Sequence, residues 1–181
     1  NGGAYYDVTP IRTTVTLGTD PFTANGTTTV TVSATLHGAT TGTFVTFSGA
    51  TGTYASTLNA EYQITVVNAN SYTITTPTAL SAGSYGGSSV SAAYQVNAGP
   101  AYAVPLTGWG SGTWGSGTWG TGTASTIALQ LWNQVNYGED LIYGPRGGGI
   151  YYWDATSGVN TRGVLLNSKG GTVTFTNASP T

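Results

Sequence analysis

Residues 61–75, with the sequence EYQITVVNANSYTIT, decide the fold that we expect for this chain. Every second residue from 62 to 66 is apolar, and Tyr72 and Ile74 show the same alternation. A period of two is typical of a β-strand that buries one face and exposes the other. The turn-forming residues 68–71 separate the two runs, so the stretch predicts two antiparallel strands joined as a hairpin.

Similar runs occur on both sides of this hairpin, at a spacing of roughly ten residues. Val30 and Val32 alternate with threonines, and the turn dipeptides Asn25-Gly26 and Gly86-Gly87 stand between neighbouring runs. Five or six short strands at this spacing predict a small sandwich or barrel that spans residues 14–97. The strands that we expect are residues 27–34, 43–47, 61–67, 71–75 and 89–96.

Strand patterns return after residue 127, and no segment of the chain has a convincing helical period. Residues 154–158, DATSG, form a good turn sequence between two of these later strands. The chain is therefore expected to be all-β. The strands that we expect in this second region are residues 128–132, 140–143, 150–153, 163–166 and 172–175.

A repeat rich in glycine and tryptophan lies between the two strand regions, with Trp109, Trp114 and Trp119 at the start of successive five-residue units. An odd period sends successive side chains of a regular strand to opposite faces, whereas a bulge in each unit brings them to one face. Packing of the indoles on a neighbouring sheet or chain is the main interpretation, and a stacking surface for sugars or bases is the alternative. The expected organisation is an N-terminal extended segment (1–13), the barrel (14–97), the repeat or linker (98–126) and a second β region (127–181).

Charged residues make up only 6% of the chain, against roughly 25% in an average globular domain. A surface of this kind suits a chain that is built into a large assembly. The net charge is −2, and the four basic residues form no patch that would hold a nucleic acid backbone by counterion release. Specific DNA binding is therefore disfavoured, while proximity to packaged DNA without specific binding remains compatible with the sequence.

The chain contains no cysteine and no methionine, which excludes disulfides, thiolate metal sites and thiol nucleophiles. His37 is the single histidine, and its place before Gly38 in a turn favours a loop or capping role over metal ligation. No apolar run approaches the roughly 18 residues that a membrane span needs. We therefore expect no metal, no cofactor and no membrane span.

No catalytic constellation is visible, so we expect the chain not to be an enzyme. Glu139 and Asp140 are adjacent and point to opposite faces of a strand, so they are not positioned to flank one glycosidic bond, and nothing in the sequence brings Asp154 to either of them. Hydrogen bonding in turns and between protomers is the favoured role for all three. The glycines after Arg146 form either a weak anion-binding nest or, as we favour, a tight crossing of two strands.

Residues 37–49, HGATTGTFVTFSG, and 58–74, LNAEYQITVVNANSYTI, resemble a small barrel that is repeated in many phage tail proteins. That barrel is similar to the first catalytic-cysteine half-domain of ubiquitin-activating enzymes. The resemblance implies a six-stranded barrel. It implies no ubiquitin chemistry, because this chain has no cysteine.

Residues 129–154, LQLWNQVNYGEDLIYGPRGGGIYYWD, resemble a blade of the tail nozzle (tail tube) protein of short-tailed, podovirus-like bacteriophages, and residues 7–12 also fit that family. The resemblance implies a β-propeller with inserted β domains, arranged as a ring around the DNA exit channel. A blade takes about 40 residues and a propeller needs at least about four blades, so residues 98–181 hold only an incomplete, propeller-like region. We therefore expect that region to need partner chains or further sequence.

The leading hypothesis is a structural component of a bacteriophage virion, in the tail nozzle or tail tube, that assembles into a ring or fibre with copies of itself and other virion proteins. The alternative is a carbohydrate-binding or adhesion module that contacts a host-surface glycan, and a polysaccharide hydrolase is a distant third. The candidate interaction surface consists of Trp109, Trp114, Trp119, Trp132, Trp153 and Arg146.

Overall fold

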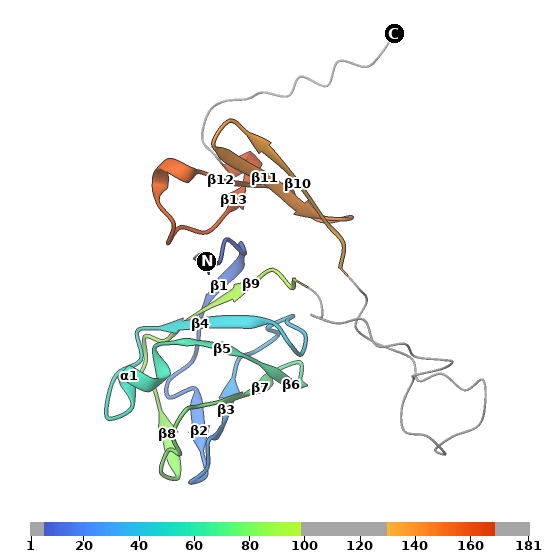
Figure 1. The fold of residues 1–181 in the computed structure, drawn as a ribbon. Helices are drawn as coiled ribbons and strands as arrows, with labels where there is room; N and C mark the ends of the chain where they lie inside the picture. The colour runs from blue at the N-terminus through green and yellow to red at the C-terminus, as the bar shows by residue number, and fades with distance from the viewer. Residues whose placement is uncertain (1–5, 99–129, 169–181) are drawn as a thin grey trace, which may run out of the picture. The chain divides into compact units, whose positions relative to one another are not determined.

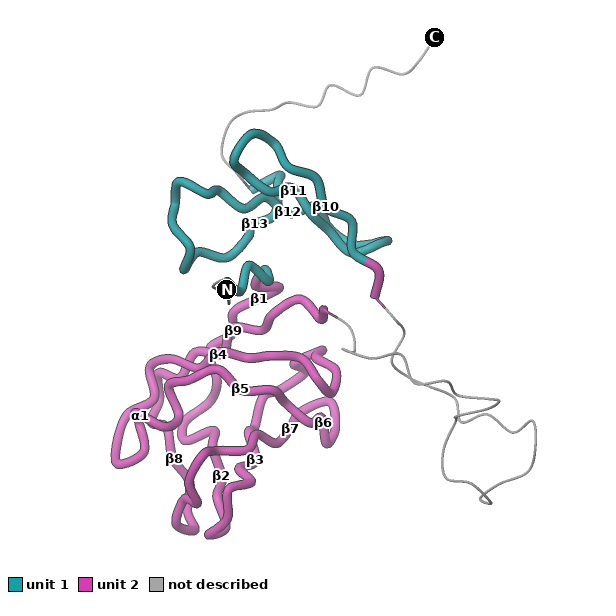
Figure 2. The backbone as a smooth tube through the Cα atoms, viewed as in Figure 1, with its two compact units in different colours: residues 1–10, 132–181 teal, residues 11–131 magenta. Residues whose placement is uncertain are grey.

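The structure is a computed structural model that describes residues 6–98 and 130–168. The chain divides into two compact units, residues 11–131 and residues 1–10 with 132–181 (Figure 2). Each unit is considered by itself below. The expected strand at residues 172–175 and the tryptophan repeat lie outside the described residues.

The larger unit contains two antiparallel sheets, one of four strands and one of five (Figure 1). The first has the order β1-β9-β4-β5 and the second the order β6-β7-β3-β2-β8. This arrangement confirms the all-β expectation, and β6 and β7 form the hairpin that residues 61–75 predict. The strands are β1 (Ile11–Thr16), β2 (Phe22–Ala24), β3 (Thr29–Ser33), β4 (Phe44–Ser48), β5 (Glu61–Gln63), β6 (Thr65–Asn68), β7 (Ser71–Thr75), β8 (Gly83–Tyr85) and β9 (Ser91–Gln95).

Alternating side chains of both sheets fill one core. Tyr72 and Ile74 of β7 are 0% and 1% exposed, as the alternation in residues 71–75 predicts. Phe22 of one sheet and Phe47 of the other meet edge to face, with their ring centroids 5.1 Å apart. Because these inward residues interdigitate, the two sheets pack in the manner of a sandwich.

The sheets are connected at two places. The expected run 61–67 divides at Ile64, where the chain leaves the first sheet as β5 and enters the second as β6. Ile64 is 1% exposed, and its N–H donates to the carbonyl of Thr43 at 3.0 Å. The second connection is an isolated antiparallel bridge between Thr51, which follows β4, and Gly86, which follows β8. The N–H of Thr51 donates to the carbonyl of Gly86 at 3.0 Å. The expected barrel or sandwich is therefore two packed sheets that share a corner, with no closed barrel among the described residues.

Three strands and one helical turn were not expected from the sequence. β1 begins at Ile11, before the boundary at residue 14, while β2 and β8 are three residues long. Strands this short are too brief to show an alternation, and they pair through backbone groups. The helix α1 (Ala55–Leu58) is a single turn, which is too short to show a helical period.

Two buried tyrosines of this core share a hydrogen bond. The hydroxyl oxygens of Tyr72 and Tyr94 lie 3.0 Å apart. Burial raises the pKa of both phenols, and for Tyr72 the hydrogen bond with Tyr94 adds to the effect. The folded core therefore strongly disfavours a phenolate at either position.

The smaller unit is built on one four-stranded antiparallel sheet. Its strands are β10 (Trp132–Tyr137), β11 (Asp140–Pro145), β12 (Tyr151–Trp153) and β13 (Val164–Leu165), in the order of the sequence. A four-stranded meander of this type is also the arrangement of a propeller blade. Two short 3-10 turns, η1 (Ala155–Ser157) and η2 (Leu166–Ser168), follow β12 and β13. The sequence predicted the first strand at residues 128–132, whereas in the structure it is Trp132–Tyr137. Polar residues on both faces of this strand remove the apolar alternation that would have indicated it.

One face of this sheet is covered by residues 7–10 and by the loop before β13. The hydroxyl of Tyr143, a residue only 7% exposed, donates to the carbonyl of Val8. The N–H of Gly163 donates to the same carbonyl at 3.1 Å. A Cβ atom on Gly163 would lie 1.9 Å from the Tyr143 hydroxyl oxygen, so only glycine fits there.

An ion pair and a hydrogen bond from Arg162 hold residues 7–9 against the loop before β13. Arg162 lies 2.8 Å from the carboxylate of Asp7, and its guanidinium also donates to the carbonyl of Thr9 at 3.0 Å. Partial burial raises the pKa of Asp7, but the hydrogen bonds from Thr9 and the charge of Arg162 outweigh it, so the pKa is lowered. The covered face therefore includes an ionised carboxylate that folding stabilises.

Candidate functional site

The opposite face of the β10–β13 sheet carries an apolar row that is exposed at its two ends and half-buried in the middle. Strand register places Val135, Ile142, Tyr152 and Val164 side by side in one row across the four strands. Val135 is 60% exposed and Val164 40%. Ile150, two residues before Tyr152 and so on the same side, is 57% exposed. We call this surface, made of the five residues just named, the open face.

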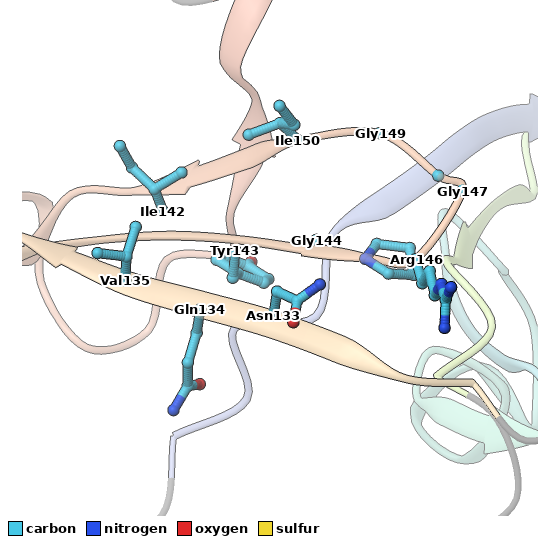
Figure 3. A pocket seen from close by; sticks show the side chains of 12 residues that line it. Asn133, Gln134, Val135, Ile142, Tyr143, Gly144, Arg146, Gly147, Gly149 and Ile150 are labelled. Carbon is cyan, nitrogen blue, oxygen red and sulfur yellow. The ribbon is translucent and has the colours of Figure 1, made fainter.

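A hollow of about 430 Å³ follows β10, β11 and the glycine hairpin after β11 (Figure 3). Val135, Ile142 and Ile150 project to one side of these strands, and Gln134 projects to the other. Three of the five residues of the open face, Val135, Ile142 and Ile150, therefore line the hollow.

Glycines allow the hairpin to approach β11 closely. A Cβ atom on Gly144 would lie 2.5 Å from the carbonyl oxygen of Gly149. Gly147 has a φ of +78°, which other residues rarely adopt. The glycines after Arg146 were expected at a tight crossing of two strands, and they instead form the turn that joins the neighbouring antiparallel strands β11 and β12. Arg146 itself is exposed at the tip of the hairpin and forms no ion pair with a described residue.

The carboxylates beside this sheet act as hydrogen-bond acceptors in turns. Asp140 precedes Leu141 and Asp154 follows Trp153, and Leu141 and Trp153 are paired across β11 and β12. Asp140 accepts from the hydroxyl of Tyr152 and, at 3.0 Å, from the N–H of Ala155. Asp154 accepts from the N–H of Thr156 at 2.9 Å. The hydrogen bond to Asp140 raises the pKa of the Tyr152 phenol to about 12.

These contacts match the role in turns that was expected for Asp140 and Asp154. Glu139 occupies the exposed two-residue loop between β10 and β11. Within residues 6–98 and 130–168, no three histidine or acidic side chains come together as a metal site. The expectation that the chain is not an enzyme stays a prediction.

The two described tryptophans of the candidate surface lie on the covered face. Trp132 packs against Tyr143, with the ring centroids 6.1 Å apart. The indole N–H of Trp153 donates to the carbonyl of Thr161 at 2.9 Å. Trp109, Trp114 and Trp119 lie outside the described residues, so their role in stacking on sugars or in packing stays a prediction.

His37 has the structural role that its sequence context predicts. Its side chain is 6% exposed, and its Nδ1 accepts from the N–H of Ala39 at 3.1 Å. Its Nε2 lies 2.9 Å from the carbonyl oxygen of Asn68 and donates to it, because Nδ1 is the acceptor. The ring packs against Tyr72 at 5.0 Å and Tyr94 at 6.4 Å. His37 therefore closes a loop over the core of the larger unit.

The open face was not identified from the sequence, although one signal was available. Leu141, Ile142 and Tyr143 are consecutive apolar residues in β11. An unbroken apolar run in a strand is typical of burial on both faces, whereas alternation is typical of burial on one. One side of this run packs on the covered face, and the other leaves Ile142 on the open face.

The described part of the chain has no helix with the length and apolarity needed to cross a membrane. No family model matches the chain, and no curated protein matches it. Among solved structures, the phage phi92 endosialidase is similar over 86% of this chain, with a TM-score of 0.39 and 17% identity. The chain spans 24% of the length of that protein. A similarity this low carries no functional argument, and the nozzle resemblance stays a prediction.

Proposed function

We propose that this chain is a structural component of a bacteriophage virion, in the tail nozzle or tail tube, and that the open face joins it to neighbouring chains in a ring or fibre. The observation that carries the proposal is the apolar row from Val135 to Val164, whose two ends are exposed, on a sheet whose other face is covered over β11 and β12. Contiguous exposed apolar surface on a folded protein marks a site of interaction.

The architecture of the smaller unit supports assembly. A sheet is stable in water when its apolar faces pack against other elements. Residues 7–10 and the loop before β13 cover only one face, and nothing among the described residues covers the other. The four-stranded meander also agrees with the blade that residues 129–154 resemble.

The composition agrees with the same proposal. With 6% charged residues, the surface depends on hydroxyl, amide and backbone groups for its hydration. Such a surface gains little solubility from charge and favours association. Four basic residues are too few for tight binding to a DNA backbone, so they suit a structural protein that lies near packaged DNA without binding it tightly.

The proposal is tested on intact virions of the phage that encodes the chain. Peptide mass spectrometry of purified particles is expected to detect the chain. Labelling with an antibody against it is expected to mark the tail in electron micrographs. Absence from the particle, or label confined to the head, would contradict the proposal. A preparation of the particle after the tail has been removed provides the control.

A further inference from the structure

Strand β10 forms one edge of the sheet in the smaller unit. Tyr137 and Asp140 flank the two-residue loop that joins it to β11, and Gly138 in that loop has a φ of +66°. The pair that closes such a hairpin exchanges both backbone hydrogen bonds, and bonded and non-bonded pairs then alternate along the strands. The N–H and C=O groups of Asn136 and Gln134 therefore point away from β11.

The partner strand agrees with this assignment. Continuing the alternation makes Trp132 and Pro145 a non-bonded pair. A proline fits there because it has no N–H to donate. The backbone groups of Gln134 and Asn136 bond to no described residue, so this edge is available for another strand.

The β10 edge also lacks the features that normally protect an edge strand. It has six residues in regular register with β11, and none of them is charged or proline. Native edges are usually short, bulged, charged or covered. The other sheet edges among the described strands meet that rule: β1 and β6 carry register shifts, and β5, β8 and β13 have two or three residues.

We infer that β10 pairs antiparallel with β10 of a second copy of the chain, with Val135 opposite Val135 of the partner subunit. This inference rests on the self-assembly in the proposed function and adds an edge contact to the contact through the open face. In this register Gln134 exchanges backbone hydrogen bonds with Asn136 of the partner subunit. Each strand thus donates and accepts the same backbone hydrogen bonds as the other, as a twofold contact requires.

Two properties of the strand favour a second copy as its occupant. No charged side chain lies on β10, so two copies meet without repulsion between like charges. The register also continues the open face, because the row from Val164 to Val135 in one copy runs directly into the same row of the other. Two four-stranded sheets become one sheet with an unbroken apolar row.

The pairing is tested by disulfide trapping in the full chain, which has no cysteine of its own. Directly opposed residues of a non-bonded pair have Cα atoms about 4.5 Å apart, which is within disulfide reach. Val135→Cys is therefore expected to form a covalent dimer under mild oxidation, read on a non-reducing gel.

Two single-cysteine variants provide matched controls. Gln134→Cys places the thiol on the same strand but on the other face, opposite Asn136 of the partner subunit. Val164→Cys places it on the open face but on β13, at the far edge. Both are expected to dimerise severalfold more slowly than Val135→Cys. Equal rates in the three variants, or the fastest rate in either control, would overturn the inference.

A proline substitution tests the edge without a thiol. Gln134→Pro removes an N–H that points away from β11, so it leaves the hairpin intact and blocks the added strand. We expect it to retain the circular dichroism and melting temperature of the parent and to lose self-association in sedimentation. Gln134→Thr keeps the N–H and is expected to associate like the parent.

The outcomes separate this inference from the proposed function. If the parent chain sediments as an oligomer and neither Val135→Cys traps a dimer nor Gln134→Pro weakens association, the β10 pairing is wrong and assembly stands. If the parent chain is monomeric at every concentration, both the pairing and the proposed self-assembly are wrong.

Discussion

Replacing three exposed residues of the open face by threonine is expected to weaken self-association strongly. The triple variant Val135→Thr, Ile150→Thr and Val164→Thr keeps β-branched side chains and therefore the preference for strands. The three residues are 60%, 57% and 40% exposed in the described structure, so about half of each side chain is available to a partner.

The magnitude follows from those exposed fractions. Fully burying a valine or isoleucine side chain contributes about 1.5–3 kcal/mol, so the exposed half contributes about 1 kcal/mol at each position. The three changes together cost about 3 kcal/mol of association free energy, which raises the dissociation constant roughly 100-fold. Unfolding free energy should change little, because solvent-exposed substitutions typically alter it by about 0.5 kcal/mol or less.

Sedimentation equilibrium of the full chain measures the dissociation constant. Val67→Thr is the matched control, because Val67 is 61% exposed and lies on β6, in the other unit. It is expected to leave the dissociation constant unchanged. An unchanged constant in the triple variant, or an equal loss in Val67→Thr, would refute the role of the open face.

Three further predictions concern stability. Gly163→Ala should lower the melting temperature, since its Cβ atom would lie 1.9 Å from the Tyr143 hydroxyl oxygen, whereas Gly18→Ala has nothing within 4 Å and should not. Because burial raises the pKa of Tyr72 above its ordinary value of 10.0, its contribution is complete below pH 10.0 and is lost as the pH rises further; urea midpoints that stay flat from pH 9 to 11 would count against this. The pKa of Asp7 is lowered from 3.8, so its contribution is present above pH 3.8 and is lost as the pH falls through the folded-state value. Asp7→Asn should therefore reduce the acid dependence of the unfolding midpoint, and an identical acid profile would contradict the role of the ion pair.

Much of the larger unit could be predicted from its alternation, because burial and sequence period agree there. In residues 71–75 the apolar residues Tyr72 and Ile74 are the buried ones, so the strand ends where the alternation ends. β8 could not be predicted, because Gly83–Tyr85 has no apolar alternation and pairs with β2 through its backbone. The corner at Ile64 could not be predicted either, because the apolar alternation continues through the point where the chain passes from one sheet to the other.

The candidate site was less accessible to sequence reasoning, because strand register creates it. Val135 and Ile150 are separated by a turn and a glycine hairpin, and only the pairing of β10, β11 and β12 brings them to one surface. The sequence placed Trp132 and Trp153 in the candidate interaction surface, yet both lie on the covered face. The same types of residue occur in the internal packing and on the open face, so residue type alone does not distinguish the two. Their exposure in the folded structure does.

The most direct test of the central claim is a cryo-electron microscopy map of the virion that contains this chain. The proposal predicts that the chain lies in the tail, with Val135, Ile142 and Ile150 buried against a neighbouring chain. A map that places the chain outside the tail, or that leaves the open face in contact with solvent, would contradict it.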